Sequence, residues 1–174
     1  TGNLGITQQH GSGNEAYIEQ IGDNLRSRQI QIGSHNEAQT VFSGHNYRNE
    51  SDDAEWSTYQ EQVGLNNQSQ LQIGNSSPNT NAYTMQYGKD NKVQGNLYED
   101  YNYLFIYQEG EDNTANTLTS EGNLNEVFIY QFGFQNEVGS PFTKGVTQKG
   151  YYNDVNIIQF GNQHSASTLQ QGEH

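Results

Sequence analysis

The sequence predicts an all-β fold, a β-solenoid of about seven two-strand coils made from fourteen half-repeats of about 11 residues. Two observations predict it. Glycine recurs at intervals close to 11 residues along almost the whole chain. Within each interval inward and outward residues alternate, which is the period of an extended strand. Each half-repeat is therefore expected to be one strand followed by a tight turn.

Residues 125–136 show the unit most clearly and read NEVFIYQFGFQN. Val127, Ile129 and Gln131 fall on one face of the expected strand, and aromatic residues fall on the other. Gly133 and Asn136 are typical of a turn that leads into the next strand.

Glutamine occupies a fixed place in this unit, two residues before the glycine, on the inward face. A buried carboxamide is costly unless it is hydrogen-bonded. Stacked about 4.8 Å from its equivalents, it can donate to one neighbour and accept from the other. The glutamines expected to form this ladder are Gln9, Gln31, Gln62, Gln86, Gln108, Gln131 and Gln159 in the odd half-repeats, and Gln20, Gln72, Gln148 and Gln170 in the even ones.

Glycine and asparagine are expected to make the turns, glycine because it tolerates positive φ and close backbone approach. The turn glycines are Gly11, Gly22, Gly33, Gly44, Gly64, Gly74, Gly88, Gly110, Gly122, Gly133, Gly150, Gly161 and Gly172, and Glu99 stands in the place of one more. The asparagines that begin a half-repeat are Asn14, Asn36, Asn91, Asn102, Asn113, Asn125, Asn136 and Asn153.

We expect a single domain over residues 1–174, because no linker or shift in composition divides the chain. The predicted coils are 4–22, 25–44, 56–74, 80–99, 102–122, 125–150 and 153–172, with insertions at 47–55, 75–80 and 139–145. The insertion at 139–145 interrupts a strand, so it should bulge outward and leave Val146 to resume the inward position.

Composition excludes several classes of protein. A net charge of −13 argues against nucleic acid as a partner. No apolar run is long enough for membrane insertion, and without cysteine there is no disulfide framework. No nucleophile–base set or carboxylate pair stands out from the repeat, so we expect neither an enzyme nor a cofactor. The first residue is Thr1, which favours a processed and exported protein.

Metal binding is not expected. The five histidines are scattered over turns and strands. The acidic loop that contains Glu50, Asp52, Asp53 and Glu55 has ligands suited to calcium, but a solvated charged loop is the favoured interpretation.

The two outer faces are expected to differ. Fifteen of the twenty-one outward places on the odd strands are apolar or aromatic, against about seven on the even strands, which include Leu71 and Ile73. Such a stripe indicates a lateral contact with a second filament, although aromatic residues also stack simply as good strand formers. The expected contact residues are Tyr83, Tyr87, Phe105, Tyr107, Phe128, Tyr130, Phe132 and Phe160.

The unit N-x-[A/V]-x-[I/L/T]-x-Q-x-G-x-x-N resembles the curlin repeat of curli, the extracellular functional amyloid of bacterial biofilms. Segments that carry the resemblance include AYIEQIGDN, LFIYQEGEDN and VFIYQFGFQN. The resemblance implies a fibre subunit that passes through an outer-membrane export channel, polymerises outside the cell and works with a nucleator. It leaves open whether this chain is the major subunit or the nucleator.

Two classes of function remain: a self-assembling fibre subunit, and a monomeric surface-binding solenoid such as an adhesin or an ice-binding protein. Ice binding favours a flat outward array of threonine, which the outward positions do not form. A soluble solenoid needs capped ends, and the repeats run from Leu4 to Gly172, which leaves little room for caps. We therefore expect a head-to-tail homopolymer in which coil seven stacks on coil one, forming a cross-β filament.

Overall fold

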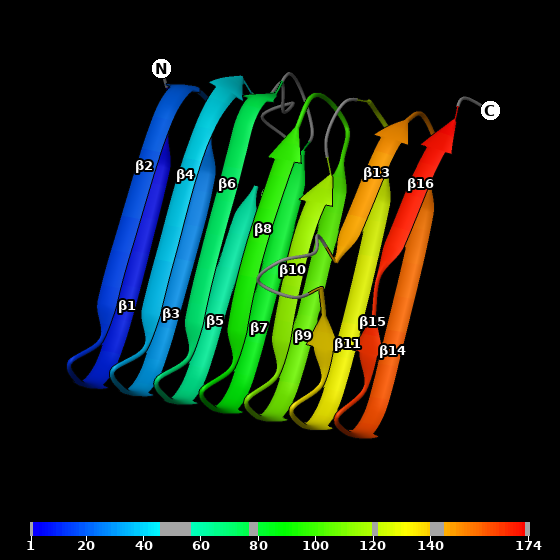
Figure 1. Cartoon of the computed structure of the whole chain (residues 1–174). Helices are drawn as coiled ribbons and strands as arrows, with labels where there is room; N and C mark the ends of the chain where they lie inside the picture. Colours follow the sequence, from blue (N-terminus) through cyan, green and yellow to red (C-terminus); the bar gives the residue numbers. More distant parts are fainter. Residues whose placement is uncertain (1, 46–56, 77–79, 120–121, 140–144, 173–174) are drawn as a thin grey trace.

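The computed structural model describes residues 2–45, 57–76, 80–119, 122–139 and 145–172, and the statements below concern these residues. They form two parallel β-sheets, and successive strands alternate between the sheets (Figure 1). None of these residues belongs to a helix that is long and apolar enough to cross a membrane.

The first sheet contains the odd strand of each coil. Its seven strands lie in chain order and pair in parallel. They are β1 (Leu4–Ser12), β3 (Arg26–Ser34), β5 (Thr58–Leu65), β7 (Asn81–Lys89), β9 (Tyr103–Glu111), β11 (Glu126–Phe134) and β14 (Asp154–Asn162).

The second sheet contains the even strands, and two of its seven places are each shared by two short strands. The continuous strands are β2 (Glu15–Asp23), β4 (Glu37–His45), β6 (Gln68–Ser76), β8 (Lys92–Tyr98) and β10 (Thr114–Thr119). The sixth place holds β12 (Glu137–Val138) and β13 (Val146–Gly150), and the seventh holds β15 (Ser165–Ala166) and β16 (Thr168–Gly172). The predicted all-β solenoid of about seven two-strand coils is confirmed.

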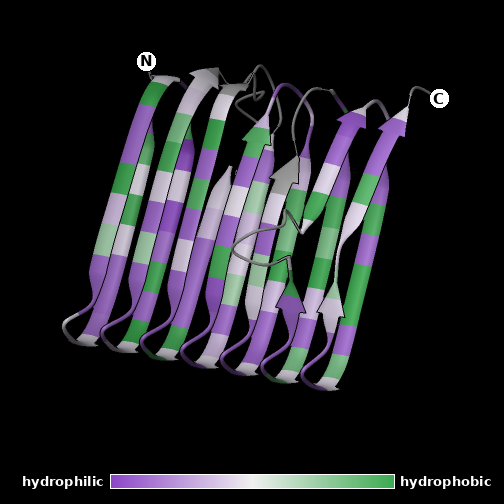
Figure 2. Cartoon of the chain, in the orientation of Figure 1, coloured by the Kyte–Doolittle hydropathy of each residue, from purple (hydrophilic) through white to green (hydrophobic). Residues whose placement is uncertain are grey.

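Equivalent residues of neighbouring coils lie side by side. In β11 and β14, for example, Val127, Ile129 and Gln131 pair with Val155, Ile157 and Gln159. The alternation along each strand is visible as bands of hydrophobic and hydrophilic colour (Figure 2). The inward residues of the later coils form an apolar core that includes Leu104, Ile106, Val127 and Ile129, all fully buried.

The three predicted insertions have different outcomes. Val138 pairs with Ala115 and Val146 pairs with Thr117, so the register of β10 resumes after the insertion at 139–145, and Val146 is fully buried. The insertion at 47–55, with its acidic loop, lies outside the described residues. The insertion predicted to begin at residue 75 begins later, because β6 extends to Ser76.

The prediction for β6 was wrong by one residue. Gln72 is exposed on the outer face, whereas Leu71 and Ile73 are fully buried. Asn67 lies seven residues before Gly74, one fewer than separate Asn14 from Gly22 and Asn36 from Gly44, so counting back from the glycine reverses the two faces. The strand keeps Asn67 in the turn and absorbs the difference in an irregularity after Ile73, where Gly44 pairs with Ser76.

The turn glycines form columns in which each glycine lies against the next coil. Eleven of the thirteen predicted glycines have φ between 103° and 152°, a region that favours glycine. A Cβ on Gly110 would lie only 1.9 Å from the carbonyl oxygen of Gly133. Gly74 does not have this conformation and lies within β6, so its prediction as a turn glycine was wrong. Glu99, which replaces a glycine, has φ of 70°.

Eleven turns among the described residues also have a second left-handed residue, two positions after the first, which the sequence analysis missed. These residues have φ between 55° and 64° and are Gly13, Asn24, His35, Asn66, Asp90, Tyr101, Asp112, Leu124, Gln135, Tyr152 and Gln163. Their side chains share no chemistry, although none is β-branched, which this backbone region would disfavour. Two left-handed residues per turn reverse the chain and leave the strands parallel to their equivalents.

We predict that Gly110→Ala strongly destabilises the fold, because it introduces both a strained φ and a backbone clash. The loss should be at least about 2 kcal/mol in the free energy of unfolding, measured by urea denaturation. Gly172→Ala is the control, since nothing lies within 4 Å of a Cβ there. Equal stability of the two variants would show that the glycine column is not needed.

Candidate functional site

The inward glutamines of the first sheet form a continuous ladder of hydrogen bonds. From Gln9 to Gln159, each Nε2 donates to the Oε1 of the next coil. The six distances lie between 2.7 and 2.9 Å, and the carboxamides of the inner coils are fully buried. All six bonds point the same way, from the N-terminal coil toward the C-terminal coil.

The same nitrogen also ties the first sheet to the second-sheet strand of the preceding coil. Gln62 Nε2 donates to the carbonyl oxygen of Glu37 at 2.8 Å, and Gln86 Nε2 donates to that of Gln68 at 2.9 Å. The acceptors are at the start of the second-sheet strands, and the same contact recurs at Gln31, Gln108, Gln131 and Gln159. Each glutamine therefore links neighbouring coils both within the first sheet and between the two sheets.

The turn from the first sheet to the second contains a second ladder, of asparagines. The Oδ1 of each asparagine accepts from the backbone N–H of the next, and its Nδ2 donates to the carbonyl oxygen of the glycine in the next coil; for Asn113 these partners are Asn136 and Gly133. The column comprises Asn14, Asn36, Asn67, Asn91, Asn113 and Asn136. Asn67 was missed because it lies closer to its glycine than the others do.

The opposite turn carries an interrupted version of this column. Asn102, Asn125 and Asn153 are linked in the same way. Asn3, which the sequence analysis missed, accepts from the backbone N–H of Leu25. Between Asn3 and Asn102 the column holds Leu25, Ser57 and Thr80. The two longer connections between strands, which end before Ser57 and Thr80, therefore belong to the turn whose asparagine ladder is interrupted.

The second sheet brings only part of its predicted glutamine column together. Gln148 Nε2 donates to Gln170 Oε1 at 3.1 Å. Gln20 instead donates to the hydroxyl of Ser27 at 2.9 Å, because its neighbour in the register is Phe42. Gln72, as described above, faces outward. The intervening inward places are filled by Phe42, Ile73 and Leu97, all buried.

A further buried amide pair was missed entirely. Gln29 Nε2 donates to Gln60 Oε1 at 2.7 Å, and Thr40 donates to the same oxygen at 2.9 Å. These glutamines occupy a place where other coils have Ile or Thr, two residues before the main column. That position, on the same face, was the signal that could have found them.

The two ends of the ladder are complementary rather than alike. Gln9 at the N-terminal end donates into the chain, and its Oε1 receives no glutamine donor from within the described residues. Gln159 at the other end accepts from Gln131 and has no further glutamine to donate to. Strands β1 and β14 each have one neighbour in the sheet, so each end also presents an unpaired strand edge.

One residue breaks the asparagine ladder at the C-terminal end. His164 takes the seventh place, where its backbone N–H donates to Asn136 Oδ1 at 3.2 Å. Its Nε2 lies 2.8 Å from the carbonyl oxygen of Phe160, as Asn136 Nδ2 lies 3.1 Å from that of Phe132. The ring therefore covers the last turn in the position that an asparagine takes in other coils.

The predicted lateral residues lie on the outer face of the first sheet, where their rings pack against one another. Phe105 lies 5.5 Å from Tyr130, and Tyr107 lies 5.4 Å from Phe132 between ring centroids. Phe132 and Phe160 are stacked at 4.8 Å, and Phe160 is 67% exposed. Tyr83, Tyr87 and Phe128 extend the same surface.

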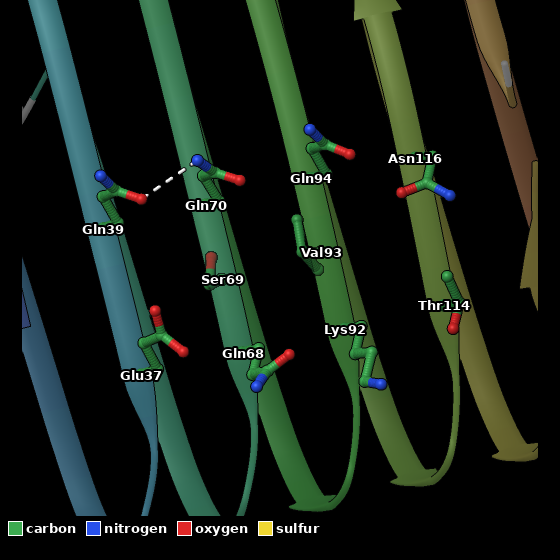
Figure 3. A pocket seen from close by; sticks show the side chains of 10 residues that line it. All are labelled: Glu37, Gln39, Gln68, Ser69, Gln70, Lys92, Val93, Gln94, Thr114 and Asn116. Carbon is green, nitrogen blue, oxygen red and sulfur yellow. Dashed lines mark hydrogen bonds between the residues drawn. The ribbon is translucent and has the colours of Figure 1, made fainter. Parts of the chain in front are cut away.

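The outer face of the second sheet is polar and slightly hollowed. Gln39, Gln70, Gln94 and Asn116 project from β4, β6, β8 and β10 in a row (Figure 3), and Gln70 donates to Gln39 at 3.0 Å. The row offers carboxamides but no nucleophile or base. Within the described ranges, no three His, Asp or Glu side chains gather in a way that could hold a metal ion.

The fold and the ladders define a class of protein, the β-solenoid whose coils are registered by inward amides. A family model described as the curlin-associated repeat matches residues 1–27 and 122–161. The chain therefore carries curlin-associated repeats in these two regions. Neither the curated proteins nor the solved structures that were searched contain a match.

We predict that Gln108→Leu destabilises the fold by about 2–3 kcal/mol, because it removes two ladder bonds and leaves the buried Oε1 of Gln131 without its glutamine donor. Gln72→Leu is the matched control on the outer face, where the effect should stay within about 0.5 kcal/mol. Chemical denaturation of both variants measures the difference. If Gln72→Leu were the more damaging, the assignment of the inward face would be wrong.

Proposed function

We propose that this chain is the structural subunit of an extracellular, self-assembling fibre of the curli type, with no enzymatic role. The observation that carries the proposal is the polarity of the glutamine ladder. One end presents a free acceptor and the other a donor, so a second copy can continue the ladder by stacking on the first. The unpaired edges of β1 and β14 extend both sheets in the same step.

In this arrangement coil seven of one copy lies on coil one of the next. Gln159 is placed beside Gln9, Gln170 beside Gln20, and Ala166 beside Ala16. Seven coils at about 4.8 Å give a rise of roughly 34 Å per subunit. The contact joins two different surfaces and does not close, so it yields an open filament rather than a dimer.

The junction differs from the interior at His164. Within the chain, at the turn from the first sheet to the second, the Oδ1 of each asparagine accepts from the backbone N–H of the next coil. At the joint, Asn14 of the next copy would lie against the ring of His164 instead. The asparagine ladder is therefore interrupted once per subunit while the glutamine ladder continues. We propose that the fibre is weakest at this joint.

The resemblance to the curlin repeat also supports proposals about how the subunit is exported, how the fibre is nucleated and what the fibre does. It favours export through an outer-membrane channel, nucleation by a partner subunit and a role in adhesion within a biofilm matrix. A role as the nucleator itself is compatible with the same ends. The competing function, a monomeric surface-binding solenoid, requires ends that do not stack.

Lateral pairing of two filaments through the aromatic face is a further part of the proposal. Ile158 and Phe160 are 55% and 67% exposed, and the rings of Phe132 and Phe160 continue the surface to the end of the chain. Each copy would bring an identical stripe at identical spacing. Contacts between neighbouring rings of the same chain already cover part of this surface. Lateral pairing would therefore add to the head-to-tail contact between copies rather than replace it.

We predict that the double variant Gln9→Lys, Gln159→Lys polymerises far more slowly than the natural chain, because it places like charges inside the joint. The control is Gln8→Lys, Asn156→Lys, which adds the same charge to outward positions of the same two coils. Electron microscopy and an amyloid-dye assay follow assembly. Unbranched fibrils with a reflection near 4.8 Å support the proposal.

Two results would contradict it. A natural chain that stays monodisperse at high concentration would favour the surface-binding solenoid. A double variant that assembles as fast as its control would place the joint elsewhere.

A further inference from the structure

We propose that Tyr87 and Tyr107 form an oxidative cross-linking site, where a one-electron oxidant joins coils four and five through a dityrosine bond. The two rings project from β7 and β9, which are adjacent in the first sheet. Their centroids are 5.5 Å apart and their planes are inclined by 36°. The register places Tyr107 beside Met85 and Tyr87 beside Glu109, so the two phenols are diagonal neighbours in contact, and both are partly exposed on the outer face.

Each phenol has a carboxylate in place to receive its proton. The hydroxyl of Tyr87 donates to Glu61 at 2.9 Å, and that of Tyr107 donates to Glu109 at 2.9 Å. Burial and the hydrogen bond to Glu61 raise the pKa of Tyr87 to about 12, and burial with the Glu109 contact raises that of Tyr107. Both groups are therefore neutral phenols near pH 7, and losing an electron requires losing the proton along the existing hydrogen bond.

The reaction balances with a peroxide oxidant. Each tyrosine gives up one electron and passes its phenolic proton through the carboxylate to water. The two radicals couple at the ring carbons next to the hydroxyl groups, and the hydrogens on those carbons move to the oxygens as the rings become aromatic again. The net loss is two electrons and two protons, which a haem peroxidase transfers with hydrogen peroxide to give two waters.

Tyr17 provides a control within the same chain. Its hydroxyl also donates to a carboxylate, Glu19, at 2.9 Å, and the side chain is 51% exposed. In the part of the chain that the structure describes, no aromatic ring contacts it. Tyr17 thus has the proton acceptor and more exposure than the proposed pair, but no second phenol at coupling distance.

The pair formed by Tyr83 and Tyr103 is the nearest competitor, with centroids 5.7 Å apart. We favour Tyr87 and Tyr107 because their rings are the closer pair. A link at this point would fasten two coils covalently while leaving the inward ladders untouched. The inference concerns a single folded chain and does not depend on polymerisation.

The test treats the dilute full-length chain, and separately its assembled form, with horseradish peroxidase and hydrogen peroxide. Dityrosine fluorescence gives the yield, and mass spectrometry of the digest locates the bond by the loss of two hydrogens between peptides. We expect a link between Tyr87 and Tyr107 within one chain. Tyr107→Phe keeps the ring packing and should abolish that link, whereas Tyr17→Phe should leave its yield unchanged.

A further variant separates chemistry from packing. Glu61→Gln with Glu109→Gln keeps the side-chain shape but removes both proton acceptors, so the rate should fall roughly tenfold or more. In urea the preference for this pair should vanish. The proposal is overturned if no dityrosine forms, if the bonds follow exposure and favour Tyr17, or if the Tyr107→Phe variant gives the same fluorescence yield.

Discussion

The fold depends on the stacking of inward carboxamides in one direction. An amide that donates to the coil ahead and accepts from the coil behind is satisfied only if neighbouring coils are nearly superimposable. This requirement explains why the sheets are parallel and why Gln31, Gln62 and Gln86 follow one another in register. It also explains how a chain that is only 30% hydrophobic forms a packed interior.

The turns serve the same requirement. A glycine whose Cβ would lie 1.9 Å from the next carbonyl oxygen is the residue that lets two coils approach to ladder distance. The asparagine side chains then form hydrogen bonds with the backbone N–H and carbonyl groups of the turns that such close packing buries. Because the ladders have a direction, the two ends of the chain differ, and this difference connects the packing of a single chain with its proposed growth into a fibre.

Much of this could be read from the sequence, since identical residues at fixed spacing predict a stacked repeat. The glutamine column of the first sheet and the fourteen half-repeats came from spacing alone. Spacing failed to predict the inward face where the unit changed length, as in β6. A one-residue difference exchanges the two faces of a strand, and the burial of Leu71 and Ile73 shows which face is inward. Residue spacing also missed the second left-handed residue of the described turns. The coil imposes the backbone conformation at that position, and the residues there share no side-chain type that a sequence pattern could reveal.

Hydrogen exchange of the side-chain amides, measured by NMR on the folded chain, tests the central claim most directly. The carboxamides of Gln86 and Gln108 are inward and fully buried, whereas those of Gln70 and Gln94 lie on the exposed face. The inward pair should exchange about a thousandfold more slowly than the outward pair. Equal exchange at all four would mean that the inward amides are open to water, and the ladder would not hold the coils together.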